Sequence, residues 1–209
     1  MSITSYSWDP GRQRYRDLGT GRYVKPAEVR AEVDKVIQYS EDQMRVASQR
    51  LARGSLDIGG WQDLMVDNLK ALHLASAASA NGGFANLTRD DIARVAGQLT
   101  NEYGYLQNFA GQLESGAQAL DGRMAQRVDM FVNSARTTYE DQRRDNMGQA
   151  GFDEERNVED PGANHCGECG ELSDSGWVPI GTLPLPGDRE CLQNCRCTLE
   201  YRGGGVEEE

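Results

Sequence analysis

The cysteines of this chain are confined to one stretch near its C-terminal end. All five lie between positions 166 and 197. A C-x2-C pair is separated by 21 residues from a C-x3-C-x-C group, and this spacing is typical of structural zinc modules. Four thiolates close a tetrahedral site, so the sequence predicts a structural zinc ion bound by four of the five. The candidate ligands are Cys166, Cys169, Cys191, Cys195 and Cys197.

The choice among the last three cysteines stays open at this point. In an extended segment Cys195 and Cys197 project to the same face, whereas Cys191 and Cys195 can meet only across a turn. Two oxidised pairs are the alternative to a metal site. The odd number of cysteines and the reducing cytoplasm favour the metal, because cytoplasmic thiols are kept reduced.

Few other residues offer catalytic chemistry. A catalytic zinc site keeps one position open for water beside a carboxylate, and Glu168 could imitate that group. Five available thiolates favour a closed, structural site instead. His165 adjoins Cys166 and is read as a solvated neighbour, and His73 as a packing residue. The sequence contains no phosphate-binding loop, nucleophile elbow or H-E-x-x-H helix. We therefore expect no enzymatic activity.

The charge is distributed unevenly along the chain. The net charge is -11, from 22 basic and 33 acidic residues. Residues 1–53 hold 10 basic and 7 acidic residues, whereas residues 54–209 hold 12 and 26. An acidic body disfavours non-specific binding to phosphate backbones. No apolar run approaches the ~20 residues that span a bilayer, and residues 1–6 lack signal-peptide features, so we expect cytoplasmic synthesis without membrane insertion.

Helical periodicity dominates residues 26–150. A helix of about 26 residues starts at Pro26 and ends before Gly54. A second runs from Trp61 to the stop signal at Asn81. A third is capped by Thr88, with the carboxylate of Asp91 at the third helical position, and a fourth is closed by the tract 141–151. The predicted fold class is mainly α, an antiparallel helical bundle or hairpins.

The first 25 residues show no sustained period and read as an extended basic and aromatic arm or a hairpin. They contain too few aliphatic residues to form their own core, so we expect them to order against a partner. The predicted partner-binding residues are Trp8, Arg14, Tyr15, Arg16, Arg22 and Tyr23.

Residues 151–209 are predicted to form a small zinc-stapled module poor in helices and strands. From Asp153 to the end the chain carries 14 acidic and 4 basic residues, and it lacks the aliphatic content for a core. A short strand is expected at residues 196–202, and disorder at residues 203–209.

The cysteine-rich tail also resembles a known family. Cys166-x2-Cys169-x2-Leu172, a proline-containing loop, and Asn194-Cys195-Arg196-Cys197 before a strand are similar to the C-terminal signature of phage minor head proteins related to the Mu F head morphogenesis protein. That family has a histidine three residues before the N-C-R-C cysteine, whereas this chain offers Cys191 one position further away. Weaker similarities lie in residues 14–24 and in the helical residues 105–110, 127 and 135–136.

The resemblance implies a structural role in the virion of a tailed phage, with assembly in the host bacterial cytoplasm. The expected partners are portal, capsid or neck proteins, with multiple copies per particle. It implies no catalytic residues. The alternative function is a zinc-knuckle module that binds the packaged genome, and a metallo-hydrolase is a third hypothesis. Oxidised cysteine pairs in the mature particle remain the alternative to zinc.

Overall fold

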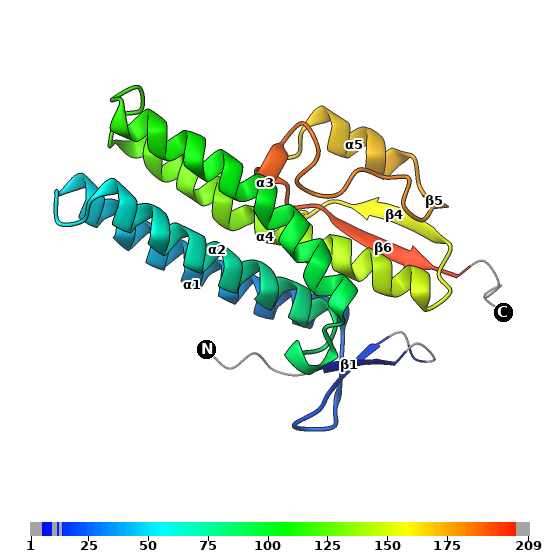
Figure 1. The fold of residues 1–209 in the computed structure, drawn as a ribbon. Helices are drawn as coiled ribbons and strands as arrows, with labels where there is room; N and C mark the ends of the chain where they lie inside the picture. Colours follow the sequence, from blue (N-terminus) through cyan, green and yellow to red (C-terminus); the bar gives the residue numbers. More distant parts are fainter. Residues whose placement is uncertain (1–5, 10–11, 13, 204–209) are drawn as a thin grey trace.

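Four long helices form most of the molecule, which confirms the mainly helical fold class. The computed structural model describes residues 6–9, 12 and 14–203. Consecutive helices run in opposite directions along one another (Figure 1), and α2 contacts each of the other three. We call these helices together the helical body. They are α1 (Pro26–Ala52), α2 (Ile58–Ala80), α3 (Arg89–Glu114) and α4 (Gly122–Gln149).

The helix boundaries follow the local signals in the sequence. Pro26 is the first residue of α1, and Asn81 caps the C-terminal end of α2. At the start of α3, the Thr88 hydroxyl accepts a hydrogen bond from the Asp91 amide at 3.2 Å, and the Asp91 carboxylate accepts one from the Thr88 amide at 2.8 Å. This reciprocal pair is the predicted capping box, with Asp in place of the usual Glu.

Aromatic side chains from three helices meet in the centre of the helical body. Trp61 of α2 lies edge-on to Phe109 of α3, with 5.5 Å between ring centroids, and Phe109 stacks on Phe131 of α4 at 6.2 Å. The Trp61 indole donates a hydrogen bond to the Ser48 hydroxyl of α1 at 3.0 Å. A fully buried indole needs such an acceptor. The hydrogen bond adds α1 to the aromatic cluster, which therefore joins all four helices.

Of the two alternatives for the N-terminal segment, an extended arm and a hairpin, the described residues show antiparallel strands, as in a hairpin. Three short strands, β1 (Tyr6–Asp9), β2 (Arg14–Asp17) and β3 (Tyr23–Val24), form an antiparallel sheet in the order β1-β2-β3, which we call the N-terminal sheet. Its inner face supplies Tyr6 and Tyr15 to the main core, where they are 6% and 0% exposed. The segment needs no core of its own because its buried tyrosines pack into the core of the helical body.

Gly82 fixes the place where the N-terminal sheet meets the end of α2. The amide of Tyr6 donates a hydrogen bond to the carbonyl of Gly82 at 2.6 Å. Gly82 has a φ of 78°, in the left-handed region, and a Cβ there would lie 1.6 Å from the Tyr6 carbonyl oxygen. Only glycine permits this contact.

The C-terminal part has more regular structure than predicted. A three-stranded antiparallel sheet has the order β5-β4-β6, formed by β4 (Glu154–Val158), β5 (Val178–Pro179) and β6 (Thr198–Arg202). The helix α5 (Gly167–Asp174) and the short 3-10 turn Leu192–Asn194 complete it, and we call residues 152–203 the cysteine module. Strand β6 confirms the strand predicted at 196–202. The expected disorder of the tail concerns residues 204–209, which lie outside the described residues.

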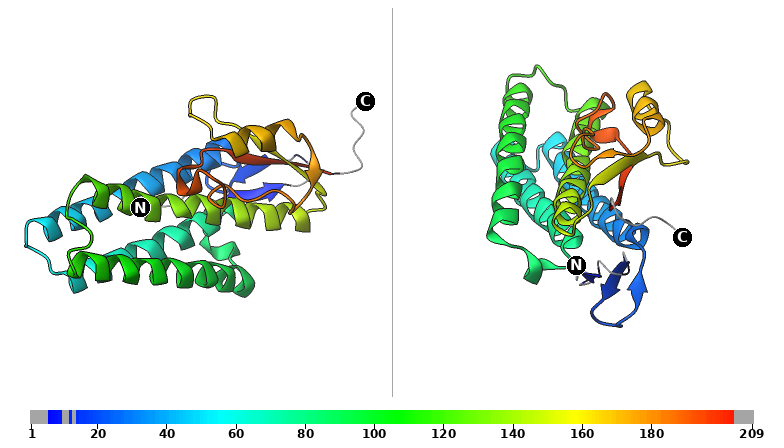
Figure 2. Two further views of the ribbon diagram at one scale, coloured as in Figure 1. Left: turned by 90° about the horizontal axis from the view of Figure 1, so that it is seen from above. Right: turned by 90° about the vertical axis from the view of Figure 1, so that its right-hand side faces the viewer.

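The cysteine module lies along α4 (Figure 2), and charged residues of this helix attach it to the helical body. The sequence predicts that the tract 141–151 closes this helix, and the helix ends within that tract, at Gln149. The Nε of Arg144, in that tract, lies 2.9 Å from the fully buried carboxylate of Glu155 in β4. The Nη2 of the same arginine donates to the Leu183 carbonyl at 2.7 Å. Arg143 donates to the Leu199 carbonyl of β6. The tract is therefore an internal contact.

His73 confirms its prediction as a packing residue. It is 1% exposed, and its ring nitrogens lie 2.7 Å from the Thr138 hydroxyl and 3.1 Å from the Ser134 hydroxyl of α4. Burial lowers its pKa to about 4. It lines a cavity of about 750 Å³ together with Glu102 of α3, whose pKa burial raises to about 7 against the opposing hydrogen bond from Ser134.

We predict that Gly82→Ala destabilises the protein by about 2 kcal/mol or more, because the new Cβ separates the N-terminal sheet from α2. Urea unfolding monitored by circular dichroism measures the change. Gly97→Ala in α3 is the matched control. A Cβ there meets nothing within 4 Å, and this variant should gain up to about 1 kcal/mol. Equal stability of the two variants would contradict the contact.

We also predict that Glu102→Gln and His73→Gln change the pH dependence of stability in opposite directions. Between pH values of about 4 and 6.5, His73 is protonated in the unfolded chain but neutral in the folded chain. Through His73, acidification over this range therefore lowers the stability of the protein, by at most about 3 kcal/mol. Between about 4.5 and 7 the folded chain holds the proton on Glu102, so that residue adds stability on acidification.

In Glu102→Gln the effect of His73 is no longer opposed by Glu102, and stability should fall more steeply than in the wild type as the pH is lowered from about 6.5 to about 4.5. In His73→Gln the effect of Glu102 is no longer opposed by His73, and the slope should change in the opposite direction relative to the wild type. Urea titrations at several pH values provide the slopes. Identical slopes in all three chains would show that neither group titrates as described.

Candidate metal centre

The first pair of cysteines is positioned by the start of α5. Cys166 is the N-terminal cap of this helix, and Cys169 lies in its first turn. Residues three apart on a helix share a face, so the C-x2-C spacing brings both thiols to the same side. Cys169 is 1% exposed and Cys166 is half-buried.

The second group of cysteines is positioned by a tight turn before β6. Cys191 and Cys195 flank the 3-10 turn Leu192–Asn194, and the Cys195 amide donates to the Leu192 carbonyl at 3.1 Å. Leu192 has a φ of 49°, a left-handed conformation that is uncommon for a residue with a side chain. Cys197 follows in extended chain. The turn that Cys191 and Cys195 require is therefore present.

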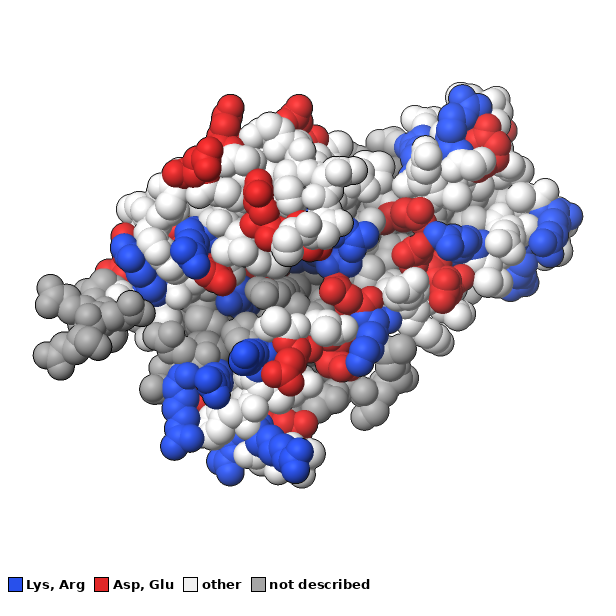
Figure 3. All heavy atoms as spheres, turned by 180° about the vertical axis from the view of Figure 1, so that it is seen from behind, with Lys and Arg blue, Asp and Glu red and all other residues white. Residues whose placement is uncertain are grey.

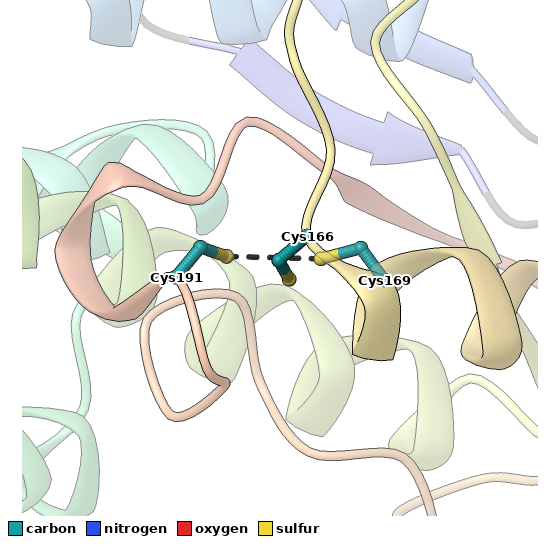
Figure 4. Close-up of side chains that lie close together, drawn as sticks. All are labelled: Cys166, Cys169 and Cys191. Atoms are coloured by element: carbon teal, nitrogen blue, oxygen red, sulfur yellow. Dashed lines mark hydrogen bonds between the residues drawn. The ribbon is translucent and has the colours of Figure 1, made fainter.

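The sulfur atoms lie at the separation that a tetrahedral metal centre requires. The Sγ of Cys169 is 3.7 Å from that of Cys191 and 3.8 Å from that of Cys195. A tetrahedron with metal–sulfur bonds of about 2.3 Å has edges of about 3.8 Å. Figure 4 shows the thiols of Cys166, Cys169 and Cys191 converging from α5 and from the turn. All five cysteines are free thiols.

Two groups of three thiols share one member. Cys166, Cys169 and Cys191 lie within 4.8 Å of one another, and so do Cys169, Cys195 and Cys197. Cys169 is therefore the central candidate ligand. The cluster can bind a metal ion, and the identity of its four ligands stays a prediction.

Glu168 and His165 are polar neighbours of the cluster, and each makes a contact with it or with its turn. The carboxylate of Glu168 accepts a hydrogen bond from the Glu190 amide, so it links the helix of the first cysteine pair to the turn of the second group. His165 is exposed, and its Nδ1 lies 3.9 Å from the Sγ of Cys197. His165 therefore contacts the cluster, and its role as a solvated neighbour stays a prediction.

Arg189 is a residue of the site that sequence reasoning missed. It is 2% exposed, and its Nη1 lies 3.9 Å from the Sγ of both Cys169 and Cys195. The same nitrogen donates to the Asn157 side chain at 2.7 Å, and Nε and Nη2 donate to the Pro184 carbonyl at 3.0 and 2.8 Å. No spacing rule marks this arginine, because the fold alone brings it to the sulfur atoms.

The surroundings of Arg189 require negative charge from the cysteines. Among the described residues the guanidinium has no carboxylate partner, and a buried cation without a counter-ion is costly. Neutral thiols or disulfides would leave it uncompensated. Four thiolates around a divalent ion carry a net charge of about -2, which compensates the arginine. The residues present therefore fit a bound divalent metal.

Two of the thiols, those of Cys191 and Cys197, do not ionise readily on their own. Burial, together with hydrogen bonds to neighbouring thiols, raises the pKa of Cys191 and raises that of Cys197 to about 12. A metal ion must therefore displace protons, and its binding weakens as the pH falls.

The predicted partner-binding residues fall into different environments in the N-terminal sheet. Arg14, Arg16 and Arg22 are exposed. Tyr23 is half-buried, and its hydroxyl donates to Asp9 at 2.7 Å. Tyr15 is fully buried in its own chain, so its prediction as a partner contact is corrected. The side chain of Trp8 lies outside the described part of the structure.

Comparisons with known proteins identify no relative: no family model, curated protein or solved structure matches the chain. Among the described residues, no helix combines the length and the apolar character needed to cross a membrane. Any function has to be inferred from the residues themselves.

We predict that Cys169→Ser reduces the metal content of the purified protein from about one equivalent to near zero, because this thiol belongs to both groups. Elemental analysis after purification under reducing conditions measures it. The corresponding serine variants of the other four cysteines are the controls. One of them, the thiol that is not a ligand, should retain a full equivalent, and full retention by Cys169→Ser would refute its central position.

We further predict that Arg189→Gln weakens metal affinity by about 10- to 100-fold, because it removes the cation that neutralises the thiolates. Competition with a chromophoric chelator at fixed pH measures the affinity. Arg196→Gln is the matched control. Arg196 is exposed and lies between Cys195 and Cys197 in sequence, but no hydrogen bond of its guanidinium to a sulfur is observed among the described residues. Equal affinities of the two variants would show that Arg189 has no such role.

Proposed function

We propose that the metal is zinc and that it stabilises the cysteine module without taking part in catalysis. The support is the set of buried sulfur ligands, since soft thiolates select zinc over magnesium or calcium. Binding energy for structural zinc in small domains is about 10 to 16 kcal/mol, and it becomes folding energy. A module with few aliphatic residues gains its stability in this way.

We propose that the chain is a minor head protein of a tailed phage that associates with portal, capsid or neck proteins. The observation that carries this proposal is the resemblance of the C-x2-C and N-C-R-C residues, followed by β6, to the Mu F-related signature. A closed site of four thiolates, as proposed for the zinc ion, agrees with a structural role. The protein is assembled in the bacterial cytoplasm and becomes part of the virion in multiple copies.

The second candidate is a zinc-knuckle module that binds the packaged genome. The exposed arginines of the N-terminal sheet favour it. The cysteine module itself opposes it, because α5 presents Glu171 and Asp174 to solvent and phosphate binding requires basic groups. Filter binding to duplex DNA at two salt concentrations separates the two functions. Tight, strongly salt-dependent binding would favour the genome.

The structural function is tested on particles of a phage that encodes this chain. We expect protein mass spectrometry to detect the chain in purified virions, and cryo-electron microscopy to locate it at the portal vertex or on the inner face of the capsid. Cys169→Ser should reduce incorporation, whereas Gly97→Ala should not. Absence of the wild-type chain from both virions and assembly intermediates would refute the proposal.

A further inference from the structure

The outer face of the N-terminal sheet carries an excess of positive charge. Because Tyr15 points into the core, Arg14 and Arg16 on either side of it in β2 point outward. With Arg12 and Arg22, both exposed, they form what we call the basic face. Among the described residues none of these four arginines forms an ion pair with a carboxylate.

The two aspartates of the N-terminal sheet are engaged in local contacts. Asp9 accepts hydrogen bonds from the Arg12 amide at 3.2 Å and from the Tyr23 hydroxyl at 2.7 Å. Asp17 accepts from the amides of Gly19 and Thr20 at 2.8 and 2.9 Å. These carboxylates stabilise turns and strand pairing. Four arginines against two aspartates leave the basic face with a net positive charge.

An acidic surface lies on the cysteine module. Glu168, Glu171 and Asp174 occur at intervals of three residues in α5, which places them along one side of the helix. Glu171 and Asp174 are exposed and make no ion pair among the described residues. Asp174 lies in the last turn, where a negative charge opposes the helix dipole. We call Glu168, Glu171 and Asp174 the acidic face.

The two charged faces lie on opposite sides of the molecule. In Figures 1 and 2, α5 and the N-terminal sheet are separated by the helical body. Figure 3 shows acidic side chains along the edge formed by the cysteine module and basic side chains along the edge formed by the N-terminal sheet. Opposite faces of one chain cannot neutralise each other within a single copy.

We propose that the basic face of one copy docks on the acidic face of a second copy of this chain. Complementary charge on the same molecule identifies the occupant. Because the two faces differ, the contact is head-to-tail, and repeated contacts build a ring or a filament rather than a two-fold dimer. Arginine and tyrosine are enriched at protein interfaces, and Tyr23 lies opposite Arg16 of the basic face in the strand register. This inference does not depend on the proposed role in a virion.

Sedimentation velocity on the full-length, metal-loaded protein tests the contact over a range of concentrations. The wild type should associate at about 50 mM salt and dissociate at about 500 mM, since screening shortens the reach of exposed charges. Arg14→Glu/Arg16→Glu and Glu171→Arg/Asp174→Arg should each stay monomeric, because each variant presents two faces of like charge. An equimolar mixture of the two variants should associate again.

The control is Arg53→Glu/Lys70→Glu, which changes the net charge as the first variant does but at exposed positions outside both faces. It should associate like the wild type. Circular dichroism and metal content establish that each variant is folded. If Arg14→Glu/Arg16→Glu does not fold, the charge-neutralising variant Arg14→Gln/Arg16→Gln is used in its place.

The proposal is overturned if the wild type is monomeric at low salt, if the control loses association equally, or if the mixture stays monomeric. A monomeric wild type that binds duplex DNA through Arg14 and Arg16 would overturn it as well, and would assign the basic face to nucleic acid.

Discussion

The buried contact between the Arg189 guanidinium and the sulfur atoms of Cys169 and Cys195 is the constraint on which the cysteine module depends. A permanent positive charge lies in the interior with only carbonyl, amide and sulfur partners among the described residues. Such a charge is tolerated when negative charge lies beside it. Thiolates around a divalent metal supply that charge, whereas protonated thiols do not. We therefore propose that the contact links the folding of an acidic, glycine-rich segment to the binding of a metal ion.

Buried polar contacts also connect the cysteine cluster to the helical body. Asn157 connects Arg189 to β4 and donates to the carbonyl of Cys169 at 3.1 Å. Two residues earlier in β4, the buried Glu155 meets Arg144 of α4. The cysteine cluster, the sheet and α4 are thus joined by a short series of polar contacts. The module is anchored electrostatically, which suits a segment with few aliphatic side chains to bury.

Local signals made a large part of this structure predictable. Apolar periodicity located the four long helices, and Thr88 with Asp91 marked the start of the third. Cysteine spacing located the cluster, and alternation of Leu199 and Tyr201 with polar residues located β6. The docking of the N-terminal strands on the helical body was not predictable, because Tyr6 and Tyr15 contact the end of α2, which is far away in sequence. Arg189 escaped notice for the same reason, since its contacts with Cys169 and Asn157 span 20 and 32 residues.

The most direct test of the central claim is X-ray absorption spectroscopy at the zinc edge of the wild-type protein, purified under reducing conditions. We predict one zinc ion per chain with four sulfur ligands at about 2.3 Å. Protein that is folded and free of zinc, or zinc with an oxygen ligand in place of a sulfur, would contradict the claim that a closed thiolate centre holds the module together and neutralises Arg189.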